Sequence, residues 1–288
     1  METNGSRKNK AGLVRDLEIL EVLGSLESKN SGGLGVSRVA ELSGRDKGQI
    51  SRTLSTLLDA GFVTRDPRSG RYRLGFQLYA MAARTNEYRI VQETLPFLRE
   101  VVNLTHETAH LCVLRGGNVL TLKSEMSPSA YRGVGWEGVS VAAAQTSSGR
   151  ALLSDWSEGE IRSWYREHAE DSLVVESEIA LPPGIAELNR EQTRAKLRTK
   201  VKSVEDLLRE LEIVRKQGYA IVDEEFELGL VGASAPIRDN SSRIIAVINV
   251  SAPKTRIGQH LHQVGEIVRR VSAAASVALG AAASLPSQ

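Results

Sequence analysis

Several features are absent or scarce in this 288-residue sequence. It has a single cysteine, Cys112, which excludes an internal disulfide and a cage of thiolates around a metal. It has no run that approaches the ~18 apolar residues of a membrane-spanning helix. It also has no glycine-rich nucleotide loop, nucleophile elbow or Cys-His pair, so we expect no cofactor and no catalytic residues. Since the first ten residues lack an apolar stretch, we expect a cytoplasmic protein without a secretory signal.

The formal net charge of +2 conceals two parts of opposite sign. Residues 1–86 hold 14 Lys and Arg against 9 Asp and Glu, a balance of +5. Residues 87–288 hold 23 against 26, a balance of −3. A small basic part joined to a larger acidic one indicates that the N-terminal part binds a polyanion. The length, which suits about two domains, agrees with this division.

The N-terminal part has the pattern of a winged helix-turn-helix, a DNA-binding fold of three helices and a β-hairpin. Residues 1–11 lack apolar periodicity and are predicted to be a flexible basic arm. Three helical stripes follow, and Asp46 precedes the third as a good N-cap. A turn at residues 66–70 joins two short β-like runs into a hairpin with four arginines. We therefore place the DNA-binding domain at residues 12–76 and a helical linker at residues 77–90.

One face of the third helix is predicted to contact DNA. At 100° per residue its leucines and Ile50 share one face, which leaves polar side chains on the other. Such groups can donate to base edges or phosphates, and the hairpin arginines can contact phosphates as well. The alternative is that this polar face is simply solvated. The residues predicted to contact DNA are Lys47, Gln49, Ser51, Arg52, Ser55, Thr56, Arg68, Arg71 and Arg73.

The larger C-terminal part has the pattern of an α+β domain. A helical connector is predicted over residues 75–105 with a break near 84–91, and Pro96 is predicted to begin a new helix capped by Thr94. Apolar periodicity and turn residues predict the other elements. The expected strands are 108–114, 119–124, 219–223, 229–237 and 243–251, and the expected helices are 149–156, 158–168, 204–217 and 257–283.

The segment from His106 to His110 matches H-E-x-x-H, the zinc-binding helix of metalloproteases. In that motif both histidines lie on one helix face. Here an apolar run and a Gly-Gly-Asn turn follow, which indicate a strand and a hairpin. Residues four apart on a strand are separated by roughly 13 Å, too far to share one zinc ion. His110 and Cys112 would then face one side of a strand, where they could border a cavity. A metal-dependent hydrolase stays as an alternative, and no metal is expected.

Two further segments carry candidate chemistry. Residues 144–150 place small hydroxyl residues and Gly149 before a helix, where free backbone N–H groups suit the carboxylate of a small ligand. A plain N-cap is the alternative. Asp223, Glu224 and Glu225 form an acidic cluster, for which pairing with Arg or Lys is favoured over metal binding or acid–base chemistry.

In their order and spacing these segments resemble the IclR family of bacterial transcriptional regulators over about residues 12–280. In the N-terminal part the resemblance is carried by residues 17–23, 44–54, 57, 61–63 and 71–75. In the C-terminal part it is carried by residues 146–153, 218–220, 223–225, 229–230 and 233–237. The sequence departs from the family pattern at Arg45-Asp46, which replace an apolar residue and a proline, at residues 141–144, which lack a proline, and in a long insertion at residues 170–200.

The resemblance implies a GAF-like domain at residues 91–284, with a curved antiparallel sheet around a small-molecule pocket. It implies that this domain binds a small organic acid as effector and forms a homodimer or a dimer of dimers. The residues implied to bind the effector are Thr146, Ser147, Ser148, Gly149, Leu230, Gly232, Ala233, Asn249 and Ser251. The strand argument adds His110 to this set.

The sequence therefore predicts a sequence-specific DNA-binding transcriptional regulator, repressor or activator, that is controlled by a small organic acid. Double-stranded operator DNA and the effector are the expected partners, and no contact with a membrane is expected. Besides the metal-dependent hydrolase, a small-molecule sensor that does not bind DNA is left open.

Overall fold

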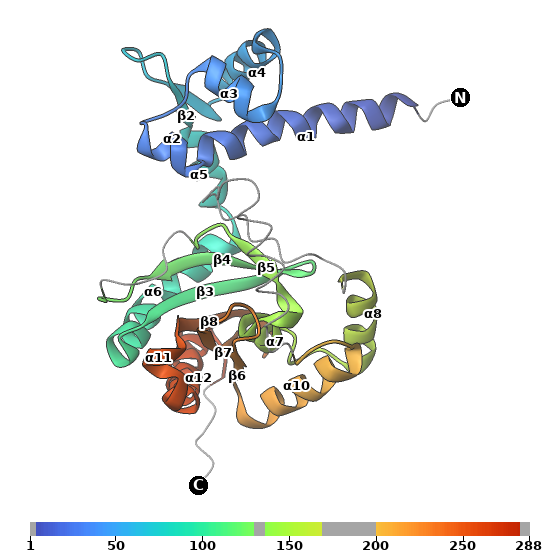
Figure 1. The fold of residues 1–288 in the computed structure, drawn as a ribbon, viewed down its shortest axis with the longest axis vertical. Coiled ribbons are helices and arrows are strands. Elements are labelled where there is room, and N and C mark those ends of the chain that lie inside the picture. The colour runs from blue at the N-terminus through green and yellow to red at the C-terminus, as the bar shows by residue number, and fades with distance from the viewer. Residues whose placement is uncertain (1–3, 130–135, 169–199, 283–288) are drawn as a thin grey trace. The chain divides into compact units, whose positions relative to one another are not determined.

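The structure, a computed structural model, describes residues 4–129, 136–168 and 200–282 of the chain. The chain divides into two compact units, the first ending at Tyr88 and the second beginning at Arg89 (Figure 1). Each unit has hydrophobic core clusters of its own. Within the described residues, no helix combines the length and the apolar character that crossing a bilayer requires.

The first unit is a winged helix-turn-helix, as the sequence predicts. Its core is formed by apolar residues of the helices and of both hairpin strands, among them Ile19, Ile50, Leu54 and Tyr72. The two strands of the wing pair antiparallel. The elements are α1 (Asn4–Gly24), α2 (Leu26–Asn30), α3 (Val36–Ser43), α4 (Lys47–Asp59), β1 (Val63–Arg65), β2 (Tyr72–Leu74) and α5 (Phe76–Ala82).

Local signals set the start of α4, the predicted recognition helix. Gly44 follows α3 in the left-handed region at φ 63°, where a residue with a Cβ would be strained. Asp46 caps α4 as predicted, because its carboxylate accepts two backbone N–H groups of the first turn, at 2.8 and 3.1 Å. Such a cap contributes about 1 kcal/mol. Since Ile50 and Leu54 are fully buried, the opposite, polar face of α4 is exposed.

The predicted flexible arm, residues 1–11, is helical from Asn4 onward and continues into α1. The prediction depended on the absence of apolar periodicity, which reports burial and not backbone conformation. No proline interrupts this stretch. A helix that is already nucleated where Ile19 is buried therefore extends toward the N-terminus at little further cost.

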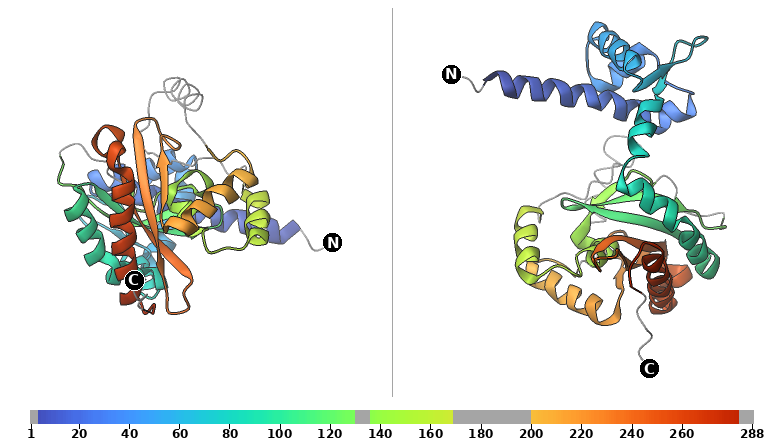
Figure 2. Two further views of the ribbon diagram at one scale, coloured as in Figure 1. Left: turned by 90° about the horizontal axis from the view of Figure 1, so that it is seen from below. Right: turned by 180° about the vertical axis from the view of Figure 1, so that it is seen from behind.

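The second unit is an α+β domain built on one antiparallel sheet with the strand order β5-β4-β3-β8-β7-β6. Helices α6 and α12 cover one face, and α7, α8 and α10 lie on the other (Figure 2). The strands are β3 (Thr108–Arg115), β4 (Asn118–Glu125), β5 (Ser140–Ala142), β6 (Ala220–Asp223), β7 (Leu230–Arg238) and β8 (Ile244–Pro253). The helices are α6 (Asn86–Thr105), α7 (Ser147–Leu152), α8 (Glu158–His168), α10 (Val204–Gln217), α11 (Lys254–Ile257) and α12 (Leu261–Ala278).

Strand register decides what each face of this sheet offers. On β3, β8 and β7 the cross-strand partners Ala109, Val250 and Ala233 join the core that includes α6 and α12. The next row of partners, on the opposite face, is polar and consists of His110, Asn249 and Ser234. A shift of one residue would exchange the two rows, so burial of the apolar row under α6 and α12 fixes the polar row beside α7.

Helix α6 differs from the predicted connector. The break between the two helices lies at residues 83–85, slightly earlier than the predicted break at 84–91. Pro96 lies inside α6 instead of beginning a new helix. Thr94 is not an N-cap, because its hydroxyl donates to the Ile90 carbonyl oxygen at 2.7 Å. A proline inside a helix costs ~3 kcal/mol or more. The buried stripe that begins at Ile90 continues past the proline, and its packing outweighs that cost.

Other predicted elements agree more closely. The predicted helices 158–168 and 204–217 coincide with α8 and α10, and the five predicted strands agree to within two residues. The predicted helix 149–156 is α7, which starts and ends earlier. The predicted helix 257–283 is instead α11, a short 3-10 turn and α12, which stops before Gly280 because that residue takes a φ of 97°. Residues 170–199 of the predicted insertion lie outside the described residues.

Candidate effector pocket and DNA-binding surface

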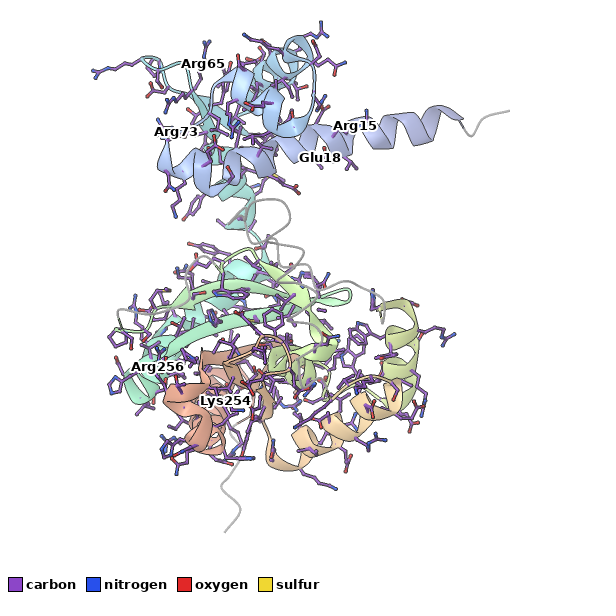
Figure 3. The ribbon with its side chains drawn as sticks, in the orientation of Figure 1. Arg15, Glu18, Arg65, Arg73, Lys254 and Arg256 are labelled. Atoms are coloured by element: carbon purple, nitrogen blue, oxygen red, sulfur yellow. The ribbon has the colours of Figure 1, made fainter. Side chains whose placement is uncertain are left out.

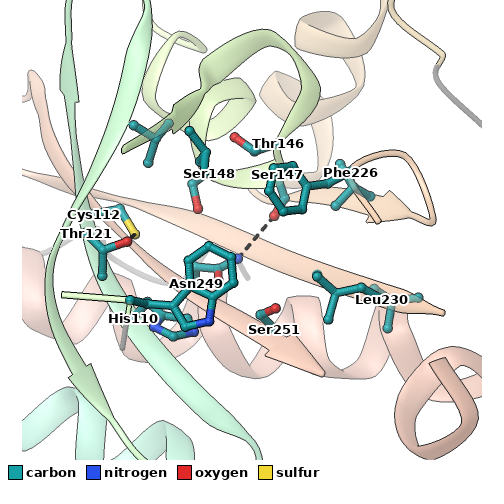
Figure 4. Close-up of a pocket in the computed structure, with 16 residues that line it drawn as sticks. His110, Cys112, Thr121, Thr146, Ser147, Ser148, Phe226, Leu230, Asn249 and Ser251 are labelled. Atoms are coloured by element: carbon teal, nitrogen blue, oxygen red, sulfur yellow. Dashed lines mark hydrogen bonds between the residues drawn. The ribbon is translucent and has the colours of Figure 1, made fainter. Parts of the chain in front are cut away.

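A cavity, partly open to solvent, lies between the polar row of the sheet and the N-terminal end of α7 (Figure 4). The polar residues that line it are His110, Thr121, Thr146, Ser147, Ser148, Asn249 and Ser251. The other lining residues are Cys112, Val119, Trp136, Val141, Val222, Phe226, Leu230, Val231 and Gly232. A few convergent polar groups in a mostly apolar cavity are typical of a small-molecule site.

A network of hydrogen bonds fastens α7 to the sheet at the polar side of the cavity. Ser234 Oγ lies 2.9 Å from Ser147 Oγ and 3.1 Å from Ser148 Oγ. Asn249 Nδ2 donates to Ser147 Oγ at 3.2 Å, to Ser234 Oγ at 2.9 Å and to a backbone carbonyl oxygen at 3.3 Å. Because these contacts use the amide hydrogens of Asn249, its Oδ1 acceptor is the atom that it can offer to a ligand.

His110 is a neutral imidazole in this cavity. It lies on β3 and is 6% exposed, and its Nδ1 lies 2.8 Å from Ser124 Oγ. Burial lowers the pKa of His110 to about 4, and the Glu137 carboxylate only partly opposes this. At neutral pH one ring nitrogen therefore donates a hydrogen bond and the other accepts one.

Cys112 borders the same cavity as a neutral thiol. It lies two residues after His110 on β3, and both line the cavity, as the strand argument predicts. Burial raises the pKa of Cys112 to about 11, and the hydroxyl groups of Thr121 and Ser148 only partly lower it. Since the thiolate is the nucleophile and the metal ligand, Cys112 acts here as a small apolar lining group.

An aromatic wall of Trp136 and Phe226 completes the cavity, and sequence reasoning missed both residues. Their ring centroids are 6.3 Å apart, and Trp136 also lies 6.3 Å from the His110 ring in an edge-on arrangement. Both side chains come from segments outside the helices and strands, one before β5 and one between β6 and β7. Periodicity in the sequence reports elements that pack a core, so it carries no signal for such residues.

A buried ion pair holds the segment that carries Phe226. Arg150 on α7 and Glu225 are both fully buried, and Arg150 forms two hydrogen bonds with the Glu225 carboxylate at 3.1 and 2.6 Å. Arg150 also donates to Glu210 on α10 at 3.2 Å and to a carbonyl oxygen before α7 at 3.2 Å. The guanidinium thus joins α7 to three other segments, and its charge compensates that of the buried Glu225 carboxylate.

Eight of the ten predicted effector residues line the cavity, and two do not. Ala233 belongs to the apolar row of β7 and is buried in the core on the other face of the sheet. Gly149 lies against the backbone of Ala143, where an added Cβ would come within 2.0 Å of the carbonyl oxygen. Its N–H donates to Thr146 Oγ1 at 3.1 Å, so Thr146 is the plain N-cap of α7 and this amide is occupied.

The H-E-x-x-H segment is divided between a turn and a strand, as the sequence predicts. His106 takes a φ of 58° at the turn after α6, and Glu107 pairs with Arg256 of α11. His110 belongs to β3 and bonds Ser124. No group of three His, Cys, Asp or Glu that could hold a metal occurs in the described part of the chain. The two histidines therefore do not share a helix face, which the hydrolase alternative requires.

The acidic cluster of residues 223–225 consists of paired carboxylates. Lys254 Nζ lies 2.7 Å from Asp223 and 2.8 Å from Glu224, and Glu225 is the partner of Arg150. This agrees with the structural interpretation of the cluster, in which the acids pair with Lys and Arg.

All six predicted DNA-contact residues of α4 are exposed on one side of the first unit: Lys47, Gln49, Ser51, Arg52, Ser55 and Thr56. In the wing the side chains of Arg68, Arg71 and Arg73 are exposed as well, and Figure 3 labels Arg73. Two of these are already engaged within the unit. Arg71 donates to the Ser31 carbonyl oxygen, and Arg73 Nη2 lies 3.5 Å from Asp66. Contact with phosphates would have to compete with these modest surface interactions.

A winged helix-turn-helix joined to an α+β domain with a cavity is the architecture of a ligand-controlled DNA-binding protein. Residues 12–67 match the IclR helix-turn-helix domain, and residues 82–176 and 184–277 match the bacterial transcriptional regulator IclR C-terminal domain. These matches cover most of the chain. The chain therefore belongs to the IclR family: it is a DNA-binding transcriptional regulator with an effector-binding C-terminal domain, and not an enzyme.

Individual relatives share this organisation over nearly their whole length. The transcriptional repressor AllR of Escherichia coli is 25% identical, over 96% of this chain and 92% of its own. The regulator Rv1719 of Mycobacterium tuberculosis is 29% identical, over 90% and 89%. The crystal structure of Thermotoga maritima IclR has a TM-score of 0.67 at 24% identity, covering 94% and 99%. An IclR homologue from Microbacterium hydrocarbonoxydans, complexed with 4-hydroxybenzoate, has a TM-score of 0.66 at 21% identity, covering 92% and 96%.

Proposed function

We propose that this chain is a sequence-specific regulator whose affinity for operator DNA is set by a small organic acid in the cavity beside α7. The observation that supports it best is that one chain carries both a DNA-binding fold and, in a separate unit, a mostly apolar cavity with few polar groups. The effector shifts the population of DNA-competent conformations, and repression and activation are both compatible with this scheme. The protein acts in the cytoplasm, where its DNA is.

The chemistry of the cavity supports an amphipathic effector. Its ring or chain packs against Trp136 and Phe226, and its polar end meets Ser148, Asn249 and His110. The described lining residues include no Lys or Arg, so a carboxylate would bind there through hydroxyl and imidazole donors. Such a ligand raises the pKa of His110, because a nearby anion favours the imidazolium form. 4-Hydroxybenzoate, which the Microbacterium homologue binds, is a suitable first probe.

The DNA complex follows from the exposed face of α4. Gln49, Arg52 and Ser55 meet base edges in the major groove, Lys47 and the wing arginines contact phosphates, and Ser51 and Thr56 flank them. Two chains related by a two-fold axis, alone or as a dimer of dimers, bind half-sites about one helical turn or a multiple of it apart.

The proposed binding to DNA is tested with a duplex that spans the region upstream of the protein's own coding sequence. The wild type should bind it in fluorescence anisotropy, and Arg52→Ala should weaken binding by about tenfold or more. Arg115→Ala, an exposed arginine of the second unit, is the matched control and should bind like the wild type. A wild type that binds no fragment at low salt would leave the sensor alternative in place.

The proposed binding of an organic acid in the cavity is tested by thermal shift with 4-hydroxybenzoate and other carboxylic acids. A stabilising acid should lose its effect in Ser148→Glu, which places a like charge in the cavity. Ser241→Glu, at an exposed turn of the same unit, should keep the effect. Acids that stabilise Ser148→Glu and the wild type equally bind elsewhere, and the proposed location would then be wrong.

A further inference from the structure

The turn between α3 and α4 holds Arg45 and Asp46, and the structure gives each residue a separate contact. Asp46 caps α4 through its carboxylate. Arg45 points back to α1, where its Nη1 lies 3.0 Å from Asp16 Oδ1 and 2.8 Å from the Arg15 carbonyl oxygen. The Arg45 side chain is only 17% exposed. The residue before the N-cap of α4 therefore forms an ion pair between the turn and α1.

Asp16 also contacts α4 itself. The hydroxyl group of Thr53, in the middle of α4, lies 3.3 Å from the same Oδ1 atom of Asp16 that pairs with Arg45. One carboxylate oxygen on α1 is therefore joined to the residue before the N-cap of α4 and to a residue seven positions after that cap. Along the chain, Arg45 and Thr53 lie on either side of the exposed residues Gln49 and Arg52.

Apolar packing fixes the position of α4 only in part, and the two contacts with Asp16 add a directional constraint. Ile50 and Leu54 bury one stripe of the helix, which sets its distance from the core, but dispersion contacts are weakly directional. Hydrogen bonds depend steeply on angle, so two of them to one fixed atom oppose rotation of α4 about its axis. A small rotation moves side chains at the helix surface off the base edges they would contact.

We propose that Asp16 is a positioning residue for DNA recognition: it sets the rotation of α4 against α1 through Arg45 and Thr53 and does not touch DNA itself. The inference uses the DNA-binding function of the family. The expected difference between operator and other DNA also depends on the proposed sequence-specific contacts of α4. Loss of Asp16 should then reduce discrimination between operator and other DNA more than it reduces binding to DNA in general.

The first unit offers a matched control. Arg38 forms a two-fold contact with Glu27, at 2.7 and 2.9 Å, which joins α3 to α2. This pair is also on the surface of the same unit, but it is not bonded to α4. The Glu27 carboxylate is 45% exposed, close to the 39% of Asp16. Glu27→Gln therefore removes a surface ion pair without loosening the recognition helix, and any effect that it shares with Asp16→Asn is general loss of stability.

The first measurement needs no DNA. In hydrogen exchange of the full-length protein, Asp16→Asn should speed exchange across residues 47–59, whereas Glu27→Gln should leave that segment unchanged. The second compares operator and unrelated duplexes. Asp16→Asn should lower operator affinity about two- to fivefold, the scale of one surface pair, and leave affinity for unrelated DNA and the salt slope unchanged.

A third variant, with two substitutions, tests whether Asp16 acts through Arg45. Asp16→Asn combined with Arg45→Gln should be only slightly worse than Asp16→Asn alone, because their ion pair is already lost and only the bond from Arg45 to the Arg15 carbonyl oxygen remains to be removed. Unchanged exchange in α4 would overturn the inference, as would an equal loss of discrimination in Glu27→Gln. If the wild type itself does not discriminate between duplexes, the proposed function fails, and the exchange measurement still decides the role of Asp16.

Discussion

At the scale of single residues, the cavity is shaped by groups whose ionisation or volume is constrained by their surroundings. His110 is held neutral because burial removes the hydration that an imidazolium needs. Gly149 is required because its neighbour is backbone and cannot move aside. Neither constraint is visible in the sequence, where the same residues were assigned by strand pattern and by resemblance.

The depressed pKa of His110 predicts a dependence of stability on pH. The unfolded chain binds a proton near pH 6.5 and the folded chain only near pH 4, so stability is greatest above about 6.5 and is lost as the pH falls toward 4. The difference corresponds to about 3 kcal/mol at full effect. Chemical denaturation between pH 4 and 7 should show this loss in the wild type and a smaller one in His110→Gln. Equal slopes in the two proteins would contradict the assignment to His110.

Gly149→Ala should destabilise the second unit. Its Cβ would come within 2.0 Å of the Ala143 carbonyl oxygen, and relieving this overlap means shifting α7, at a cost of about 1–3 kcal/mol or more. Gly159→Ala in α8 is the control, since nothing lies within 4 Å of that Cβ and alanine favours a helix by up to about 1 kcal/mol. Thermal unfolding should move in opposite directions for the two variants.

At the scale of elements, helices are positioned by a few polar contacts added to apolar packing. The capping of α4 is a local case. Asp46→Ala should cost about 1 kcal/mol and weaken DNA binding, because the first turn of the recognition helix frays. Asp59→Ala, at the other end of α4, is the control: its carboxylate lies near the negative end of the helix dipole, so its loss should be neutral or slightly stabilising. Denaturation and anisotropy report the two effects.

The ion pair behind the cavity is a longer-range case. Arg150→Met leaves the Glu225 carboxylate buried without its partner and should cost about 3–5 kcal/mol. The double variant Arg150→Met with Glu225→Met removes both charges and should recover most of that loss. Arg209→Met, which removes an exposed pair with Asp206, should change stability by less than about 1 kcal/mol. A double variant as unstable as the single one would mean that the other bonds of the pair, to Ala144, Glu210 and the Lys200 backbone N–H, carry the stability.

At the scale of the whole molecule, the charge balances of +5 and −3 separate two kinds of recognition. DNA affinity should fall steeply as salt rises from 50 to 200 mM, because each phosphate contact releases counterions. Arg68→Ala should reduce the slope of log affinity against log salt by about one. Binding of 4-hydroxybenzoate, in a cavity lined without Lys or Arg among the described residues, should change little over the same range. A DNA affinity that is flat with salt would count against the wing arginines as phosphate contacts.

The sequence by itself determined the elements whose signals are local. A cap, a turn or a periodic stripe acts within a few residues, which is why α4, α8, α10 and the hairpin of β3 and β4 were predicted closely. The prediction that Pro96 begins a new helix was wrong for the same reason. Proline breaks a helix locally, but here burial in the packed domain outweighs that effect.

Only the tertiary structure decided the contents of the cavity. Strand register placed His110, Asn249 and Ser234 in one row, and segments far apart in the chain brought Trp136 and Phe226 together. It also showed that Arg45 pairs with Asp16, a contact across 29 positions of the chain. These choices depend on which surfaces meet after folding. Because non-local contacts are set by the burial of whole faces, no short stretch of the sequence contains them.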